Sequence, residues 1–322
     1  MAPLLTTLAA GAARLWRADR ALTSVGWVML ALLAVFGVGL LVDPRTVTGM
    51  PVWLKPAKFA VSIAIYSFTL AWIFTFIPAW RRTRLWAGRI SAAMFLVEIA
   101  IIAAQAWRGT TSHFNIGTPL DAVLFAAMGA GILVQTLSSV LVAVALWRAP
   151  LADRAMGAAL RAGVIITILG ASTAGLMTRM TGDQALHLRE TGRVTTVGAH
   201  TVGAPDGGAG LPGTGWSLDH GDLRVPHFVG LHAMQVLPLL ALVLRRRLDE
   251  PDARRGVRAA AVSYVALVSA LLFQALRGEP LLAPGPATSI VIVAWAVGTG
   301  IGMWAATRGR TVETRTPSTA GV

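Results

Sequence analysis

The chain has 322 residues, of which 55% are hydrophobic and only 13% are charged, and its mean hydropathy is +0.65. Because charged residues make up about a quarter of an ordinary soluble domain, this composition excludes that class and predicts an integral membrane protein. The net charge of +13 comes from basic clusters between apolar segments, which argues against a nucleic-acid partner, and the absence of cysteine excludes disulfides, Fe–S clusters and thiolate catalysis.

Eight segments are long and apolar enough to cross a bilayer core of about 30 Å, which takes about 20 residues of helix. They predict an all-α integral membrane protein with eight transmembrane helices, near residues 22–42, 57–79, 86–107, 119–147, 158–178, 226–244, 257–276 and 286–307. Residues 1–21 form a cytoplasmic segment that is either an interfacial helix or a frayed terminus, and residues 308–322 form a disordered cytoplasmic tail. The first helix has no small-residue cleavage signature at its end, so we expect it to be retained.

Lys and Arg are unevenly distributed between the two ends of these helices. With a cytoplasmic N terminus, 19 of the 28 basic residues lie on the cytoplasmic side. The positive-inside rule therefore predicts that both termini are cytoplasmic, in a multi-pass protein of the cell inner membrane. All six histidines and both lysines lie at the outer ends. The long outer loop, 179–225, contains VGAPDGGAGLPGTGW, which is too rich in Gly and Pro for regular structure, and we expect function near this surface.

Two short elements recur at a fixed offset of 169 residues. They are LKPAKFAVSIA (54–64) with LRVPHFVGLHA (223–233), and QAWRG (105–109) with QALRG (274–278). Two matches in one register predict an internal duplication into two four-helix repeats, residues 22–147 and 148–307. Because both halves have the same orientation, a pseudo-two-fold axis along the membrane normal would relate them. Lys58 then corresponds to His227.

Glu98 is the only acidic residue in the middle of a predicted span, where a carboxylate is costly unless it accepts a proton, binds a ligand or forms an ion pair. His232 lies about a turn and a half into its span, so Glu98 and His232 are candidate catalytic residues. The structural alternative is that His232 only ties helices together through a backbone carbonyl. A divalent metal or heme would be held by His227, His232, His113 and Asp222. We expect no dyad between Ser112 and His113, because neighbouring side chains point apart.

The other candidates are basic and amide side chains at the outer ends. Guanidinium groups bind carboxylates and head groups well, and the only two lysines open the second span. We therefore predict a site for a small anionic or lipid-like ligand, formed by Lys55, Lys58, Gln105, Arg108, Gln274 and Arg277. The alternative for the two arginines is snorkelling to the interface beside a glycine that ends the helix.

The two four-helix halves, TRMTG (178–182) at the outer end of the fifth span, and His227 at the start of the sixth resemble heme A synthase. This resemblance implies a heme held by histidines near the outer face. The chain departs from that family, which has histidines on the second and fourth helix of each half and a glutamate in the first outer loop. Here the second span begins with Lys58, and the fourth and eighth spans contain no histidine. We therefore transfer no catalytic role.

Three functions stay open from the sequence. The first is a ligand-binding protein or membrane-embedded enzyme with an outward-facing polar site between the halves, in contact with the lipid bilayer and with no nucleic-acid partner. The second is a proton- or ion-coupled transporter, favoured by the repeat and by Glu98, although no matching polar set lies near the inner ends of the spans. The third is a structural partner of other membrane proteins.

Overall fold

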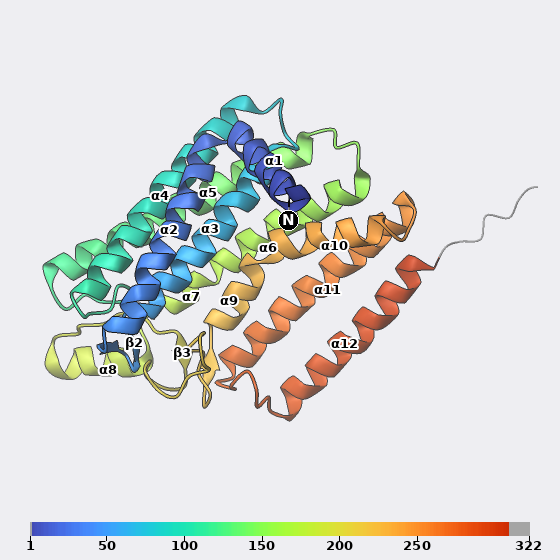
Figure 1. The fold of residues 1–322 in the computed structure, drawn as a ribbon. Coiled ribbons are helices and arrows are strands. Elements are labelled where there is room, and N and C mark those ends of the chain that lie inside the picture. The colour runs from blue at the N-terminus through green and yellow to red at the C-terminus, as the bar shows by residue number, and fades with distance from the viewer. Residues whose placement is uncertain (1, 309–322) are drawn as a thin grey trace, which may run out of the picture.

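The structure is a computed structural model that describes residues 2–308, and it is a bundle of long helices (Figure 1). The helices are α1 (Ala2–Ala18), α2 (Arg20–Val42), α3 (Leu54–Phe74), α4 (Arg81–Trp107), α5 (Pro119–Arg148), α6 (Arg154–Ser172), α7 (Ala174–Met177), α8 (Gly182–Thr191), α9 (Arg224–Leu231), α10 (Ala233–Arg245), α11 (Glu250–Leu276) and α12 (Pro286–Thr307). Within this part of the chain, seven helical segments are long and apolar enough to cross a membrane, and the bent pair α9 and α10 makes an eighth. The prediction of a multi-span helical membrane protein is therefore confirmed. The predicted disordered tail, from residue 309 onward, lies outside the described residues.

Polar side chains mark where several helices begin. The Asp19 carboxylate accepts a hydrogen bond of 2.8 Å from the backbone N–H of Leu22 at the start of α2. Asp153 and Asp249 cap α6 and α11 in the same way. Each side chain satisfies an N–H group that has no partner inside the helix, so these boundaries follow from the local sequence.

One end of the bundle, which we call the loop end, carries the short strands and α8 (Figure 1). The strands form two antiparallel pairs, β1 (Thr46–Val47) with β2 (Met50–Pro51) and β3 (Thr201–Val202) with β4 (Gly221–Asp222). In α8, Thr181 and Gln184 form a capping box. The long loop 179–225 thus contains a helix that we did not predict, while its Gly-rich and Pro-rich stretch 203–216 consists of turns, bends and one isolated bridge.

The sixth predicted span, 226–244, is broken at His232. α9 and α10 meet there with a bend of 46°. Pro238, inside α10, has no N–H to donate to the carbonyl of Met234, so the helical hydrogen-bond ladder is interrupted close to the break. His232 is the junction residue of two helices and does not lie inside a straight one.

Glycines bring α6 very close to α9 and α10. A Cβ atom on Gly170 would lie 2.6 Å from the carbonyl carbon of Gly230, and a Cβ on Gly163 would lie 2.9 Å from the Cα of Met234. Small residues allow such close backbone contact between membrane helices. Away from the loop end, the bundle is closed by a buried apolar core that includes Phe74, Leu146, Leu160 and Leu237.

Helices at equivalent positions of the two halves have equivalent bounds. α4 and α11 are both 27 residues long, and both of their ends are separated by the offset of 169 residues. α3 begins at Leu54 and α9 at Arg224, which is one residue from the same offset. These bounds fit the predicted duplication, which stays a prediction.

Candidate functional site

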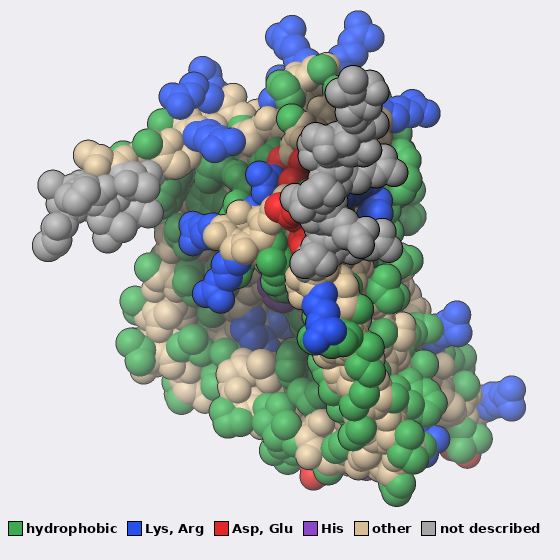
Figure 2. Space-filling model, turned by 90° about the vertical axis from the view of Figure 1, so that its right-hand side faces the viewer, with side chains coloured by type: hydrophobic (Ala, Val, Ile, Leu, Met, Phe, Trp, Pro, Cys, Tyr) green, Lys and Arg blue, Asp and Glu red, His purple; other side chains and the backbone are tan. Residues whose placement is uncertain are grey.

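A cavity of about 2370 Å³ extends from the loop end into the bundle. Its walls come from α3, α4 and α5 on one side and from α6 and α9 on the other, and the long loop also contributes. Pockets for drug-sized ligands occupy about 300–1,000 Å³, so this cavity has room for a molecule of lipid size. Figure 2 shows the side of the molecule that lies to the right in Figure 1, turned away from the loop end, where Lys and Arg side chains gather together with Asp and Glu.

Lys55, at the start of α3, contacts a histidine in the connection between α4 and α5. Its Nζ lies 3.0 Å from Nδ1 of His113, and the Ser112 hydroxyl lies 3.1 Å from the same nitrogen. Burial, followed by the charge of Lys55, holds the pKa of His113 well below its usual value, so the ring is neutral at pH 7 and Nδ1 can accept both hydrogen bonds. The expectation that Ser112 and His113 point apart is therefore wrong, and both line the cavity.

Glu98 lies on the other side of the same imidazole ring. Its Oε1 is 3.5 Å from Nε2 of His113, and the residue is only 4% exposed. Within residues 2–308 this oxygen has no hydrogen-bond partner. A buried carboxylate oxygen without a partner is energetically costly, so Glu98 is a group that a ligand or a proton can satisfy.

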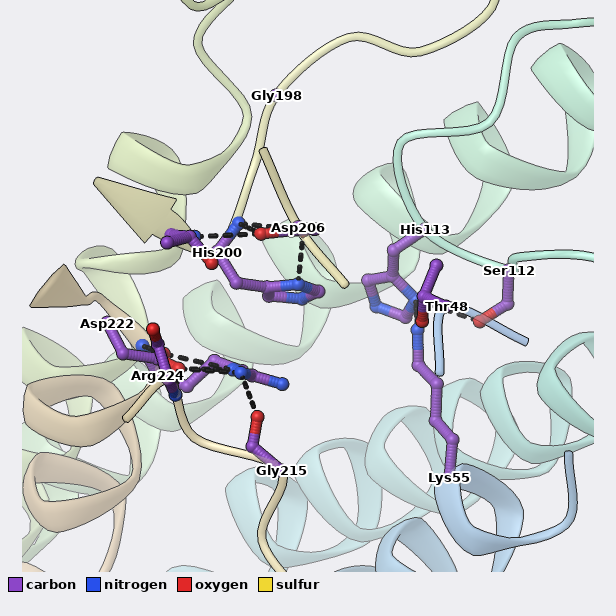
Figure 3. A network of polar contacts seen from close by, with 12 residues as sticks. Thr48, Lys55, Ser112, His113, Gly198, His200, Asp206, Gly215, Asp222 and Arg224 are labelled. Carbon is purple, nitrogen blue, oxygen red and sulfur yellow. Dashed lines mark hydrogen bonds and ion pairs between the residues drawn. The ribbon is translucent and has the colours of Figure 1, made fainter. Parts of the chain in front are cut away.

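Arg224 lies across a common space from Lys55 and His113 (Figure 3). Its guanidinium group makes an ion pair with Asp222 at 2.6 Å and donates to the carbonyl oxygen of Gly215, also at 2.6 Å. The Asp222 side chain is almost fully buried, so this pair fixes the start of α9 against the long loop. Arg224 is thus held rigidly with part of its guanidinium group facing the cavity.

Lys58 lies one turn further into α3 and donates to the carbonyl oxygen of Thr214 at 2.7 Å. Lys55, Lys58 and Arg224 repel one another electrostatically, and Glu98 attracts Lys55. Among the carboxylates of the described chain, none forms an ion pair with either lysine. The cavity mouth therefore carries two ammonium groups without a direct counterion.

His200 is oriented by a carboxylate of the long loop. Its Nδ1 lies 2.8 Å from Oδ2 of Asp206, which also accepts hydrogen bonds from the backbone N–H groups of His200 and Thr201. Burial would raise the pKa of Asp206, but these bonds outweigh it and hold the pKa below its usual value. When Nδ1–H donates to Asp206, Nε2 of His200 is the acceptor nitrogen of the ring, and His200 lines the cavity (Figure 3).

His227 and His232 both line the cavity. Nδ1 of His227 donates to the carbonyl oxygen of Gly170 at 2.9 Å, with Thr173 at 3.3 Å. The bond to a backbone carbonyl that we considered for His232 is thus made by His227. This bond leaves Nε2 of His227 as its free acceptor.

The structure does not bring Gln105 and Arg108 to the cavity. Gln105 is fully buried and donates to the Asp121 carboxylate at 2.8 Å, and Arg108 makes an ion pair with the same carboxylate at 2.6 Å. Arg108 also donates to the side-chain oxygen of Gln105. These contacts hold the connection between α4 and α5. Neither residue lines the cavity, so a ligand-binding role for this pair stays a prediction.

Gln274 and Arg277 are placed in the same way in the second half. Gln274 donates to the carbonyl oxygen of Pro280 at 2.7 Å, and Arg277 makes an ion pair with Glu279 at 2.6 Å. Neither residue lines the cavity. Their contacts hold the turn after α11.

The predicted metal and heme ligands do not form a ligand set. Within the described part of the chain, no group of three or more His, Asp or Glu side chains could hold a metal ion, and Asp222 is engaged by Arg224. The residues also do not fit a heme held as in the resembling family, because α5 and α12 contain no histidine and Lys58 stands where a paired histidine is needed. No step of a reaction is therefore derived through a metal or heme, and those roles stay predictions.

Sequence reasoning missed two residues of the cavity mouth, Arg224 and His200. Arg224 aligns with Lys55 at the offset of 169, and this signal could have identified it. His200 lies in the long loop, and its contact with Asp206 depends on how that loop folds. No periodicity in the sequence carries this information.

Comparison with known proteins adds no relative. The chain matches no family model, no curated protein and no solved structure. The resemblance to heme A synthase is therefore one of architecture alone, and function has to be argued from the cavity.

Acidification should destabilise the loop end. Burial lowers the pKa of both His113 and His200, and it is the largest cause in each case. A histidine whose pKa is lowered in the folded protein binds a proton more readily in the unfolded chain. The free energy of unfolding is therefore highest above about pH 6.5, where the ring is neutral in both states, and it falls as the pH drops below that value. We expect the unfolding temperature in detergent to fall between about pH 7.5 and about pH 5, and to fall less in His113→Gln. Identical, flat pH profiles of the two proteins would contradict the burial of this ring.

Proposed function

We propose that this multi-pass membrane protein binds an anionic amphiphile in the cavity. The charged head group lies between Lys55, Lys58 and Arg224, and the apolar tail extends toward the middle of the bundle. The observation that carries this proposal is that two ammonium groups without counterions and a long apolar wall belong to one cavity. A neutral lipid would not satisfy the lysines, and a small hydrophilic anion would leave the apolar wall uncovered.

The apolar wall lies below the charged mouth. Its side chains come from α4, α5 and α6 and include Phe95, Ile102, Met128, Ile132, Leu133 and Ile168. Tyr66 still lines the cavity eleven residues after Lys55, which is about 16 Å further along α3 at 1.5 Å per residue. Burying an alkyl chain contributes about 0.8 kcal/mol per methylene, so a tail of this length adds substantially to affinity.

An internal duplication would explain why both halves contribute a basic side chain to the cavity mouth. Gly109 and Gly278 have φ angles of 70° and 73° and end the two QAxRG elements at identical positions. The preceding glutamines, Gln105 and Gln274, both donate to a carbonyl six residues ahead. We infer two repeats that place Lys55 and Arg224 at equivalent points of the mouth.

The proposal is tested by binding measurements on the protein in nanodiscs. The probes are a long-chain carboxylate, the uncharged alcohol of the same chain length, and acetate as a short anion. We expect the carboxylate to bind at least about tenfold more tightly than the alcohol, with a preference that weakens as salt rises, because the distinguishing interaction is electrostatic. Stronger binding of acetate than of the long-chain acid would point to a hydrophilic anion, and equal binding of acid and alcohol would contradict the proposal.

A second candidate function is acid–base catalysis on the bound molecule. It is favoured by the contact between His113 and Glu98, whose free oxygen lies beside the proposed head group. Glu98 would accept the proton, and His232 lines the same cavity. General acid–base groups contribute roughly 10²–10⁴-fold to a rate, so Glu98→Gln should lower turnover of an identified substrate by at least about 100-fold.

A proton- or ion-coupled transporter is the alternative, and it needs a state in which the apolar core around Leu160 and Leu237 opens. Uptake into proteoliposomes that follows a pH gradient and disappears in Glu98→Gln would favour it. A purely structural partner is the remaining alternative, and it predicts that substitutions at the cavity mouth leave function intact.

A further inference from the structure

A second polar cluster lies in the same cavity, deep between α3 and α5. The Tyr66 hydroxyl is 3.0 Å from the Ser139 hydroxyl, and the side-chain amide of Gln135 donates to Tyr66 at 3.3 Å. All three residues line the cavity. Gln135 and Ser139 are each 6% exposed, so the cluster is a built site in the interior of the bundle and not a part of the solvated mouth.

The cluster has an unused hydrogen-bonding position. Oε1 of Gln135 is buried and has no partner among residues 2–308. Exchanging the amide oxygen and nitrogen would give Tyr66 a different partner atom but would leave the other amide atom unpaired. A buried polar atom without a partner is energetically costly, so a ligand group that donates a hydrogen bond to this oxygen removes that cost.

The distance between the two polar regions is set by α3. Lys55, Lys58, Ser62 and Tyr66 are spaced three or four residues apart, so they lie on one face of the helix, and all four line the cavity. Tyr66 is about 12 Å along the axis from Lys58 and about 16 Å from Lys55. Thr69 continues this face, but it is outside the cavity and bonds to Gln235.

We propose that the ligand is bipolar: a long-chain anion whose tail carries a hydroxyl group that donates a hydrogen bond to Oε1 of Gln135 at the deep end of the cavity. This inference rests on the proposed function, since it adds a second anchor to the same bound molecule. The apolar residues between the two polar regions require an alkyl or isoprenoid spacer. Its length has to match the roughly 12–16 Å between Lys58 or Lys55 and Tyr66.

The test compares a series of long-chain carboxylates with their ω-hydroxy derivatives, each pair matched in chain length, bound to the full chain in nanodiscs. A net hydrogen bond is worth about 0.5–1.5 kcal/mol, so the ω-hydroxyl should raise the affinity roughly two- to tenfold when the chain has the matching length. It should not raise the affinity of a much shorter chain. The ratio of the two affinities should fall to about one in Gln135→Leu. Gln135→Met removes the same acceptor with a side chain of similar length, and it gives the same readout if the leucine variant does not fold.

Thr69→Val is the matched control, because it removes a hydroxyl from the same face of α3 outside the cavity and should leave the ratio unchanged. If neither acid nor ω-hydroxy acid binds, the proposed function itself is wrong. If both bind equally at every chain length, the deep cluster holds only water and this inference is overturned, while the proposed function stands.

Discussion

Replacing Lys55 and Lys58 together by methionine should lower the affinity for a long-chain carboxylate by about 100-fold or more. Hydrogen bonds to charged groups contribute about 1.5–3 kcal/mol each, and 100-fold corresponds to about 2.8 kcal/mol. Methionine keeps the length and apolar character of the lysine stem, so the change removes charge with little change in packing. The measurement is calorimetric titration of the carboxylate into the protein in nanodiscs.

The matched control is Arg193→Met, which removes one positive charge from an exposed position of the long loop outside the cavity. It should change the affinity less than about twofold, since exposed charges are screened by salt. An equal loss of affinity in Arg193→Met and in the double lysine variant would show that only the overall charge of the surface attracts the acid. A double variant Lys55→Arg and Lys58→Arg measures whether the compact ammonium group itself is required.

Replacing Gly170 by valine should strongly destabilise the packing of α6 on α9. A Cβ on Gly170 would meet backbone atoms of Gly230 and Leu231 at 2.6–2.8 Å, and backbone cannot rotate away as a flexible side chain can. Overpacking of this kind costs about 1–3 kcal/mol and sometimes more. The carbonyl oxygen of Gly170 also accepts the hydrogen bond from His227, so separation of α6 and α9 would displace that ring from the cavity.

The control for this change is Gly298→Val in α12, where an added Cβ would have no heavy atom within 4 Å. We expect Gly170→Val to lower the unfolding temperature in detergent strongly, and Gly298→Val to leave it nearly unchanged. Equal unfolding temperatures of the two variants would contradict the close packing of α6 on α9.

The architecture was largely predictable, because long apolar segments are the strongest signal that a sequence carries. The eight predicted spans correspond to the helices of the structure, with boundaries shifted by a few residues where Asp19, Asp153 or Asp249 caps a helix. The break at His232 was not placed by hydropathy, since both α9 and α10 are apolar. α8 was missed because its capping residues, Thr181 and Gln184, lie in the long loop. The Gly and Pro content of that loop led us to expect no regular structure there.

The site was predictable where it lies on helices. Lys55, Lys58 and Glu98 were predicted from their positions in or beside apolar spans, and the structure brings them to one cavity with His113 and His227. Gln and Arg in the QAxRG elements were assigned to ligand binding because their chemistry suits it. The structure shows that the turns after α4 and α11 use these side chains, a local role that sequence spacing does not reveal.

The deep polar cluster had a signal in the sequence that we did not use. The spacing of Lys55, Lys58, Ser62 and Tyr66 marks one polar face on an otherwise apolar helix, which in a membrane protein points to a cavity or a partner helix. Gln135 and Ser139 complete the cluster from α5, and their contact with Tyr66 depends on how the helices pack.

The most direct test of an anionic amphiphile in this cavity is photo-crosslinking with a long-chain carboxylate that carries a diazirine in its tail, followed by mass mapping of the labelled peptides. We predict labels on cavity residues such as Tyr66, Met128 and Ile132, and their loss in the Lys55→Met, Lys58→Met double variant. Labels confined to exposed apolar positions of α12, such as Ile290 and Trp304, and unchanged in the double variant, would contradict the proposed function.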